Sequence, residues 1–208
     1  YLQSKTRYVS IQLGIGGLQP FYAADVDRLG YGDCKALTNY MRAMLSAVDV
    51  KSYYTVVKAG RFETDIHTDF PSDQFNHVIL CVPVENDTVW LECTSQTNPF
   101  GYIGNFTDDR HVLVVTDDGG KLVCTTSYSK EDNKQIREIK AKIEESGKAT
   151  AEVKTEFTGL QYDNRSHIII KSKDDQKKAL YKILDINDFT IKSLDYIENK
   201  TMIPSVEE

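Results

Sequence analysis

Long apolar runs are missing from this sequence. None approaches the ~18 residues that a bilayer-spanning helix needs, so no transmembrane segment is predicted. Proline and glycine are also scarce, at 5 and 12 of 208 residues, which excludes collagen-like and low-complexity chains. A strongly basic stretch is absent too, and the net charge is −6, which disfavours binding to a nucleic-acid backbone. What remains is the composition of a folded globular protein.

Cysteines are few: Cys34, Cys81, Cys93 and Cys124. We expect free thiols rather than a disulfide scaffold, which fits a reducing compartment and does not exclude the periplasm. The first residues contain no initiator Met, no basic region and no apolar signal region. The last residues carry no capping or packing signal. We therefore expect this chain to be a fragment of a longer one.

The length fits one domain or two small ones. Beyond Ser129 the sequence becomes more charged and alternates strictly between apolar and polar residues, which places a domain boundary near residue 128. The two expected domains, 1–128 and 129–208, are both of the α+β class. The first should hold a helix packed on an antiparallel sheet, and the second should be smaller and rich in β-structure.

Apolar spacing and turn residues predict the elements of the first domain. A buried stripe of Leu37, Met41, Met44, Leu45 and Val48 predicts a helix over Cys34–Val48. The polar stretch Gly60–Gln74 predicts a long surface loop, a common place for the rim of a site. The other predicted elements are an extended segment Arg7–Leu13, a strand Lys51–Lys58, a hairpin of His77–Val84 with Val89–Cys93, and a hairpin of His111–Thr116 with Lys121–Thr126.

The second domain should begin with a hairpin. Alternating residues from Ile139 to Ile143 and from Ala149 to Val153 flank the turn sequence Glu145–Lys148. Helices are predicted over Tyr162–Lys171 and Asp174–Leu184, followed by a last strand over Phe189–Ile197.

Three residues of the first domain could form a catalytic group. Cys34 follows Gly-Asp at a predicted helix start, where unpaired N–H groups and the helix dipole favour a thiolate. A cysteine nucleophile also needs a base and a group that orients the base. His77 opens one predicted strand, and Glu92 lies in an apolar run on the returning strand, where a carboxylate needs a partner.

The register of the predicted hairpin tests this grouping. If Val84 pairs with Val89, His77 and Glu92 share a face because strand side chains alternate. His77 would then lie opposite Gln96, four positions or about 13 Å from Glu92. In that register a bulge near Pro83 or strong twist is needed to close the gap.

Three motifs resemble a known superfamily. Tyr31-Gly-Asp-Cys-Lys35, Phe75-Asn-His-Val-Ile79 and Trp90-Leu-Glu-Cys-Thr94 are similar to the transglutaminase-like superfamily of papain-fold cysteine enzymes. More narrowly, the chain resembles bacterial multidomain members with an N-terminal β domain, this core and a C-terminal β-rich domain. The resemblance covers 7–106 closely and the remainder more weakly.

The resemblance implies a nucleophile at Cys34, a base at His77 and an orienting carboxylate at Glu92. It also implies a peptide or protein amide substrate, no cofactor, an upstream β domain as neighbour, and a periplasmic or cell-surface location. Two positions depart from the family pattern: Glu92 replaces the usual Asp, and Ala36 stands where relatives often carry an acid. The family's long helix before the core is nearly absent.

The oxyanion hole would need the Cys34 N–H and one further donor. Gln12 and Gln19 both precede Cys34, and we favour Gln12 because it ends an extended segment; a solvated strand Gln is an equal alternative.

A metal site is not expected, because the histidines lack His-x-x-x-His spacing and the cysteines lack Cys-x-x-Cys spacing. Asp117-Asp-Gly-Gly120 fits a hairpin turn better than a calcium site.

Two functions remain open at this point. The first is a cysteine enzyme that acts on amide bonds through a thioester, with hydrolysis favoured over transfer to an amine. The second is an inactive scaffold of the same fold that binds a peptide or a glycan.

Overall fold

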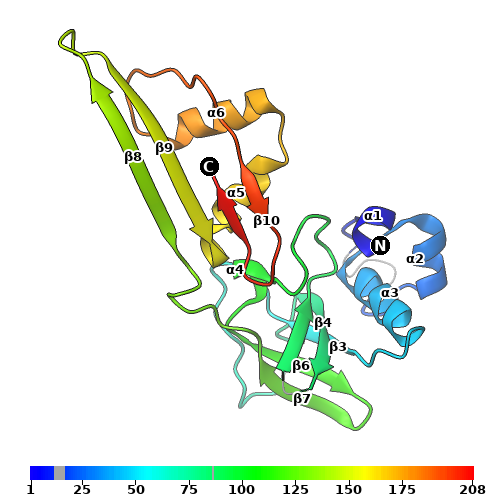
Figure 1. Cartoon of the computed structure of the whole chain (residues 1–208). Coiled ribbons are helices and arrows are strands. Elements are labelled where there is room, and N and C mark those ends of the chain that lie inside the picture. Colours follow the sequence, from blue (N-terminus) through cyan, green and yellow to red (C-terminus); the bar gives the residue numbers. More distant parts are fainter. Residues whose placement is uncertain (12–16, 86) are drawn as a thin grey trace. The chain divides into compact units, whose positions relative to one another are not determined.

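The computed structural model describes residues 1–11, 17–85 and 87–208. The fold is α+β with antiparallel main sheets, and the chain divides into two compact units, unit 1 (Tyr1–Ser127) and unit 2 (Tyr128–Glu208) (Figure 1). Unit 1 contains α1 (Leu2–Lys5), β1 (Arg7–Tyr8), α2 (Ala23–Leu29), β2 (Tyr31–Gly32), α3 (Cys34–Ser46), β3 (Tyr53–Val57), β4 (His77–Val84), β5 (Asp87–Leu91), α4 (Gly104–Thr107), β6 (His111–Thr116) and β7 (Gly119–Cys124). Unit 2 contains β8 (Gln135–Ile143), β9 (Ala149–Thr158), a 3-10 turn (Gly159–Gln161), α5 (Asp163–Ile169), α6 (Lys173–Ile183), β10 (Ile197–Asn199) and β11 (Ser205–Glu207).

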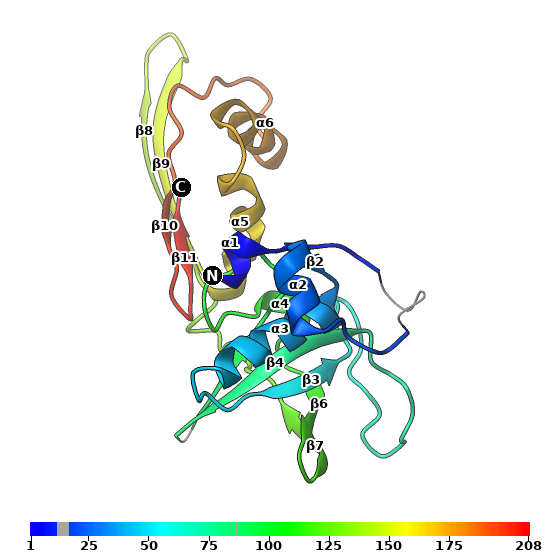
Figure 2. The ribbon, with the colours of Figure 1, turned by 90° about the vertical axis from the view of Figure 1, so that its right-hand side faces the viewer.

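The core of unit 1 lies between α3 and one face of a five-stranded sheet, ordered β5-β4-β3-β6-β7 (Figure 2). Leu37 and Tyr40 of α3 belong to the same buried cluster as Leu80 and Val82 of β4. Leu80 and Val82 are two positions apart and therefore share a face of the strand. Packing α3 on this face holds the helix against the β4–β5 hairpin.

The start of α3 is fixed by a cap and by a close approach. Asp33 is the N-cap residue, and its Oδ1 accepts a hydrogen bond from the Ala36 N–H at 3.0 Å. Gly32 precedes the cap, and a Cβ there would lie only 2.7 Å from the Cβ of Ala36. Ala36 is itself fully buried, so the chain can enter the helix here only with a small residue at position 32.

The predicted stripe on α3 is wrong at its far end. The helix stops at Ser46, and Val48 is 66% exposed beyond it. Met41, Met44 and Leu45 are partly buried against the core, while Ala36, Leu37 and Tyr40 are fully buried. The core contact thus concentrates in the first half of the helix, next to Cys34.

Two further predictions for unit 1 need correction. Of the extended segment Arg7–Leu13, only Arg7–Tyr8 forms a strand, which pairs in parallel with Tyr31–Gly32; its last two residues lie outside the described ranges. The turn between β4 and β5 is shorter than predicted, because Val84 pairs with Asp87 rather than with Val89. Glu85, with φ of +41°, begins this tight turn.

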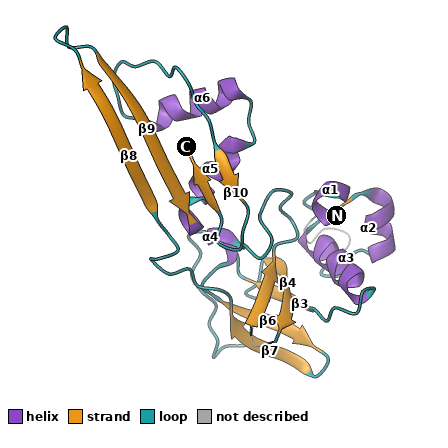
Figure 3. Ribbon diagram, in the orientation of Figure 1, coloured by secondary structure: helices purple, strands orange, loops and turns teal. Residues whose placement is uncertain are grey.

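Unit 2 is built on a four-stranded sheet, ordered β10-β11-β9-β8 (Figure 3). Phe157 and Val206 pair across β9 and β11, and both are buried. The guanidinium of Arg165 on α5 lies 4.2 Å from the centre of the Phe157 ring and donates to Glu208 Oε2 at 2.8 Å. One face of the sheet base is thereby closed by α5.

The strand predicted over Phe189–Ile197 is wrong. Only Ile197 of this segment is in a strand, β10. Upstream, the backbone bonds to side chains of α6 instead of to a neighbouring strand: the Ile191 N–H donates to the Tyr181 hydroxyl, and the Leu194 carbonyl accepts from Lys173. Apolar content alone does not show whether the backbone of a segment forms hydrogen bonds with a neighbouring strand or with side chains of a helix.

The core packing leads to a stability prediction. Leu37→Ala removes a side chain that is 1% exposed and should lower the free energy of unfolding of unit 1 by about 2–5 kcal/mol. Val48→Ala, at the exposed end of the predicted stripe, should change it by less than about 0.5 kcal/mol. Urea denaturation of the two variants measures both; equal effects would contradict the observed placement of α3.

Candidate functional site

The side chains of Cys34, His77 and Glu92 meet at one end of the β4–β5 hairpin. His77 Nε2 donates a hydrogen bond to Glu92 Oε2 at 2.8 Å. The Cys34 side chain lies close enough to the imidazole to help raise the pKa of His77. Because Nε2 is bound to Glu92, Nδ1 is the ring nitrogen that remains for Cys34. The imidazole thus lies between a thiol and a carboxylate, and Cys34 is half-buried, so the thiol keeps some access to solvent.

The short turn explains why Glu92 reaches His77. Leu80 pairs with Leu91, the last residue of β5, and the same register continued past this pair would set Ile79 opposite Glu92 and His77 opposite Thr94. Glu92 is therefore two positions from His77 along the ladder, about 7 Å, rather than four. The gap expected from the sequence closes through the register, and no bulge at Pro83 is involved.

Both members of the ion pair are removed from solvent. The side chains of His77 and Glu92 are 8% and 5% exposed. Burial acts to lower the pKa of His77, but the charge of Glu92 and hydrogen bonds to Cys34 and Glu92 outweigh it and raise the pKa to about 9. Burial acts to raise the pKa of Glu92, yet the His77 charge holds it below its usual value. The imidazole is therefore an imidazolium at neutral pH.

Residues that the sequence analysis missed hold the pair in place. Glu92 Oε1 accepts from the N–H of Thr94 at 2.9 Å and from its hydroxyl at 2.5 Å. The ring of Phe106 stands edge-on to the imidazole, with centroids 5.3 Å apart. Asn76, just before His77, exchanges two hydrogen bonds with the backbone of Ala59. A Thr two positions after the acid was the available signal, whereas nothing local marks Phe106.

The entrance to α3 carries a second pair of charges. Asp33 and Lys35 form a buried ion pair on either side of Cys34. The phenol of Tyr54 on β3 is near this group: burial, followed by the negative charges of Cys34 and Asp33, raises the pKa of Tyr54. Tyr54 therefore remains a hydrogen-bond donor at neutral pH. The packing of β3 brings Tyr54 close enough to feel these charges, and no local motif indicates this.

The oxyanion candidate Gln12 lies outside the described residues. The donor that can be placed is the N–H of Cys34, in the first turn of α3, where backbone N–H groups lack intrahelical partners. Tyr54 is a second candidate donor within the described chain.

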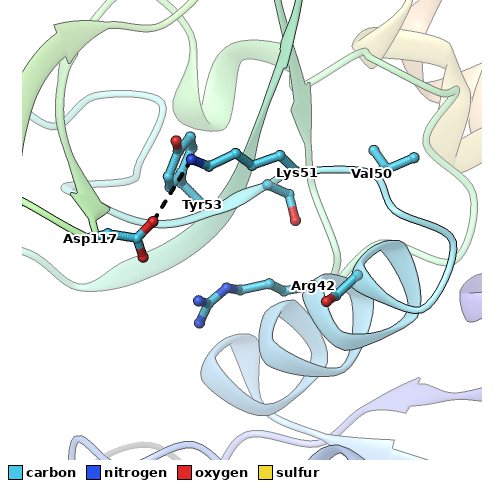
Figure 4. Close-up of a pocket in the computed structure, with 7 residues that line it drawn as sticks. Arg42, Val50, Lys51, Tyr53 and Asp117 are labelled. Atoms are coloured by element: carbon cyan, nitrogen blue, oxygen red, sulfur yellow. Dashed lines mark ion pairs between the residues drawn. The ribbon is translucent and has the colours of Figure 1, made fainter.

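A separate pocket of about 440 Å³ opens at the other end of β3 (Figure 4). It contains no residue of the Cys34 group. Lys51 and Asp117 form an ion pair in its wall at 3.8 Å, and both are mostly exposed, so solvent screens these charges (Figure 4). The lining residues are Arg42, Ser46, Val50, Lys51, Ser52, Tyr53 and Asp117.

Within the described ranges, no three His, Cys, Asp or Glu side chains are grouped so that they could hold a metal ion. In the same part of the chain, no helix is long and apolar enough to cross a bilayer. All four cysteines are free thiols.

The ion pair leads to a pH prediction. The folded pKa of His77, about 9, exceeds the roughly 6.5 of an unfolded histidine, so its stabilising contribution is complete below about pH 6.5 and is lost as the pH rises through 9. Glu92→Gln removes the main charge that raises this pKa and should lower it by about one unit or more. NMR titration of the His77 ring measures the shift. Glu63→Gln, on the exposed loop, is the control and should leave the His77 pKa unchanged.

The chain was compared with family models, with curated proteins and with solved structures, and none of them matches it. The functional interpretation therefore depends on the geometry and chemistry of the Cys34 group itself.

Proposed function

We propose that unit 1 is a cysteine enzyme of the transglutaminase-like type, with a papain-like core, that acts on amide bonds. The observation that carries the proposal is the buried imidazole of His77, which is hydrogen-bonded to Glu92 and whose pKa is raised by both Glu92 and Cys34. A nucleophile, a base and an orienting group in contact are the minimum for nucleophilic catalysis by cysteine. A buried Cys that only fills space needs neither partner.

In the first half of the reaction, the Cys34 thiolate attacks the carbonyl carbon of the amide. The developing oxyanion would be stabilised by the Cys34 N–H and by the phenol of Tyr54. As the C–N bond breaks, the His77 imidazolium gives its proton to the leaving amine, and a thioester remains on Cys34. Glu92 keeps the imidazole oriented throughout and neutralises its charge.

In the second half, water attacks the thioester and His77 accepts its proton. The C–S bond then breaks, which releases a carboxylic acid and restores the thiolate–imidazolium pair. With an amine in place of water, the same steps give a new amide. We favour hydrolysis, because the half-buried Cys34 keeps access to solvent and water is the more abundant acceptor.

Both departures from the family pattern are compatible with activity. The extra methylene of Glu92 is accommodated, since its carboxylate lies 2.8 Å from His77 and accepts two more bonds from Thr94. Ala36 belongs to the buried core and not to the group around His77, so an acid is not needed there to orient the base.

The first test measures thiol reactivity. Alkylation at pH 7, resolved by peptide mapping, should modify Cys34 about ten-fold or more faster than the exposed Cys124, because an adjacent imidazolium and a helix start favour the thiolate. Burial raises the pKa of Cys81 to about 11 and that of Cys93 to about 12, so both should stay protected.

His77→Ala should slow the alkylation of Cys34 to the rate of Cys124, while His67→Ala on the surface loop is the matched control. A Cys34 that reacts no faster than Cys124 in the unaltered protein would favour the alternative, a non-catalytic scaffold that binds a peptide or glycan.

The second test measures turnover on a panel of fluorogenic peptide amides, with and without an added primary amine. Cys34→Ala should abolish turnover, and Cys124→Ala should preserve it. Glu92→Gln should reduce kcat by about 10²–10⁴-fold, because the imidazole loses its orienting charge. Glu92→Asp should also reduce kcat, since the shorter side chain withdraws from His77. Product that carries the added amine would indicate transfer; absence of turnover across the panel would count against the enzyme.

A further inference from the structure

The β8–β9 hairpin of unit 2 has an uncovered apolar face. Three cross-strand pairs lie side by side on it: Ile139 with Val153, Ala141 with Ala151, and Ile143 with Ala149. Ile139 is 59% exposed and Ile143 is 74% exposed. At the base of the hairpin the same face carries Phe157, which is buried. Only the base is covered, where Arg165 of α5 lies over Phe157, and β11 bonds to β9 only over residues 155–158 (Figure 1).

The outer edge of β8 is also open. β8 is the last strand of its sheet, and all nine of its residues are exposed. Its backbone groups on that side have no neighbouring strand within the described chain. Open edges of this length favour pairing with another strand. A strand that is exposed on both faces and on one edge is therefore the surface of unit 2 that most needs a partner.

The charged face of β8 suggests which partner fits. Glu138, Lys140 and Lys142 alternate with the apolar residues and point to the opposite face. Across the hairpin, Lys140 lies opposite Glu152 and Lys142 opposite Thr150, and neither lysine forms an ion pair in the described part of the chain. Acidic and basic residues two positions apart on one strand make that strand complementary to an antiparallel copy of itself.

We propose that two copies of this chain associate through β8, edge to edge and antiparallel, around a two-fold axis at Ile139. The two four-stranded sheets would then form one continuous sheet. The two Ile139 side chains would lie opposite each other on the apolar face, and each would partly cover the other. An isologous contact of this kind closes on itself, which limits the assembly to a dimer.

Charge selects this register among its neighbours. An axis at Ile139 places Lys140 opposite Glu138 of the second copy, and does so twice. An axis at Glu138 or at Lys140 would set two like charges directly opposite each other, and an axis at Ala141 would oppose Lys140 and Lys142. Opposite charges across strands stabilise a sheet, and like charges destabilise it. A second copy of β8 is thus favoured over an unrelated strand.

Charge reversal tests the register. Analytical ultracentrifugation of the full chain should show a dimer at concentrations of about 100 µM or below. Glu138→Lys and Lys140→Glu should each weaken association about ten-fold or more, because each creates two like-charge pairs. The double variant restores the opposite pairs and should return to within about three-fold of the original affinity. Glu145→Lys and Lys148→Glu, in the hairpin turn, are the controls and should have little effect.

Cross-linking tests the axis independently, and it applies even if charge reversal disturbs folding. Paired Cα atoms in antiparallel strands are about 4.5–5.5 Å apart, within the range that a disulfide spans. With Cys34 and Cys124 replaced by Ala, Ile139→Cys should form a disulfide-linked dimer on mild oxidation. Ile143→Cys should not, because it would face Gln135 of the second copy.

A monomer at every concentration would overturn the proposal, and so would equal cross-linking at the two positions. A dimer that the double variant fails to restore would do so as well, since a different surface would then mediate it. None of these outcomes depends on Cys34, so the dimer and the enzyme can succeed or fail separately.

Discussion

The buried ion pair between His77 and Glu92 is the constraint on which the site depends. Removing two charges from water is costly unless each finds partners with good geometry. Glu92 meets this condition with three hydrogen bonds, one from His77 and two from Thr94. Because Nε2 is committed to the carboxylate, Nδ1 is the nitrogen left for Cys34. The pair thus stabilises the hairpin end and, by the same contacts, fixes the direction in which the imidazole can exchange a proton.

Local signals allowed much of this site to be predicted from the sequence. The Gly-Asp before Cys34 predicts a capped helix start. The alternation of residues along β4 predicts on which face of the strand His77 lies. The distance to Glu92 could not be predicted in the same way. The distance depends on whether the turn that begins at Glu85 has two residues or four. The difference in length shifts the pairing of β4 with β5 by two positions. Tertiary packing decides the register, and here it reduces the separation of His77 and Glu92 along the hairpin from four positions to two.

Two errors of the sequence-based prediction share a physical cause, since both segments are held by contacts distant along the chain. α1 is only four residues long. It is held in place by the Gln3 side chain, which donates hydrogen bonds to the carbonyls of Ser95 and Asn98 in the loop after Glu92. The segment before Ile197 resembles a strand in composition, yet α6 side chains satisfy its backbone. Such partners are invisible to a window of neighbouring residues.

The two units differ in how far they bury the residues of their strands. In unit 1, the strand residues of β4 are buried almost throughout, and the charges at its start are paired within the unit. In unit 2, every residue of β8 is exposed, and its outer edge has no neighbouring strand in the described part of the chain. All contacts described for the Cys34 group come from unit 1 residues. The chemistry of unit 2 must therefore be sought on its own surface, where an open edge of alternating charge is best satisfied by a strand of complementary pattern.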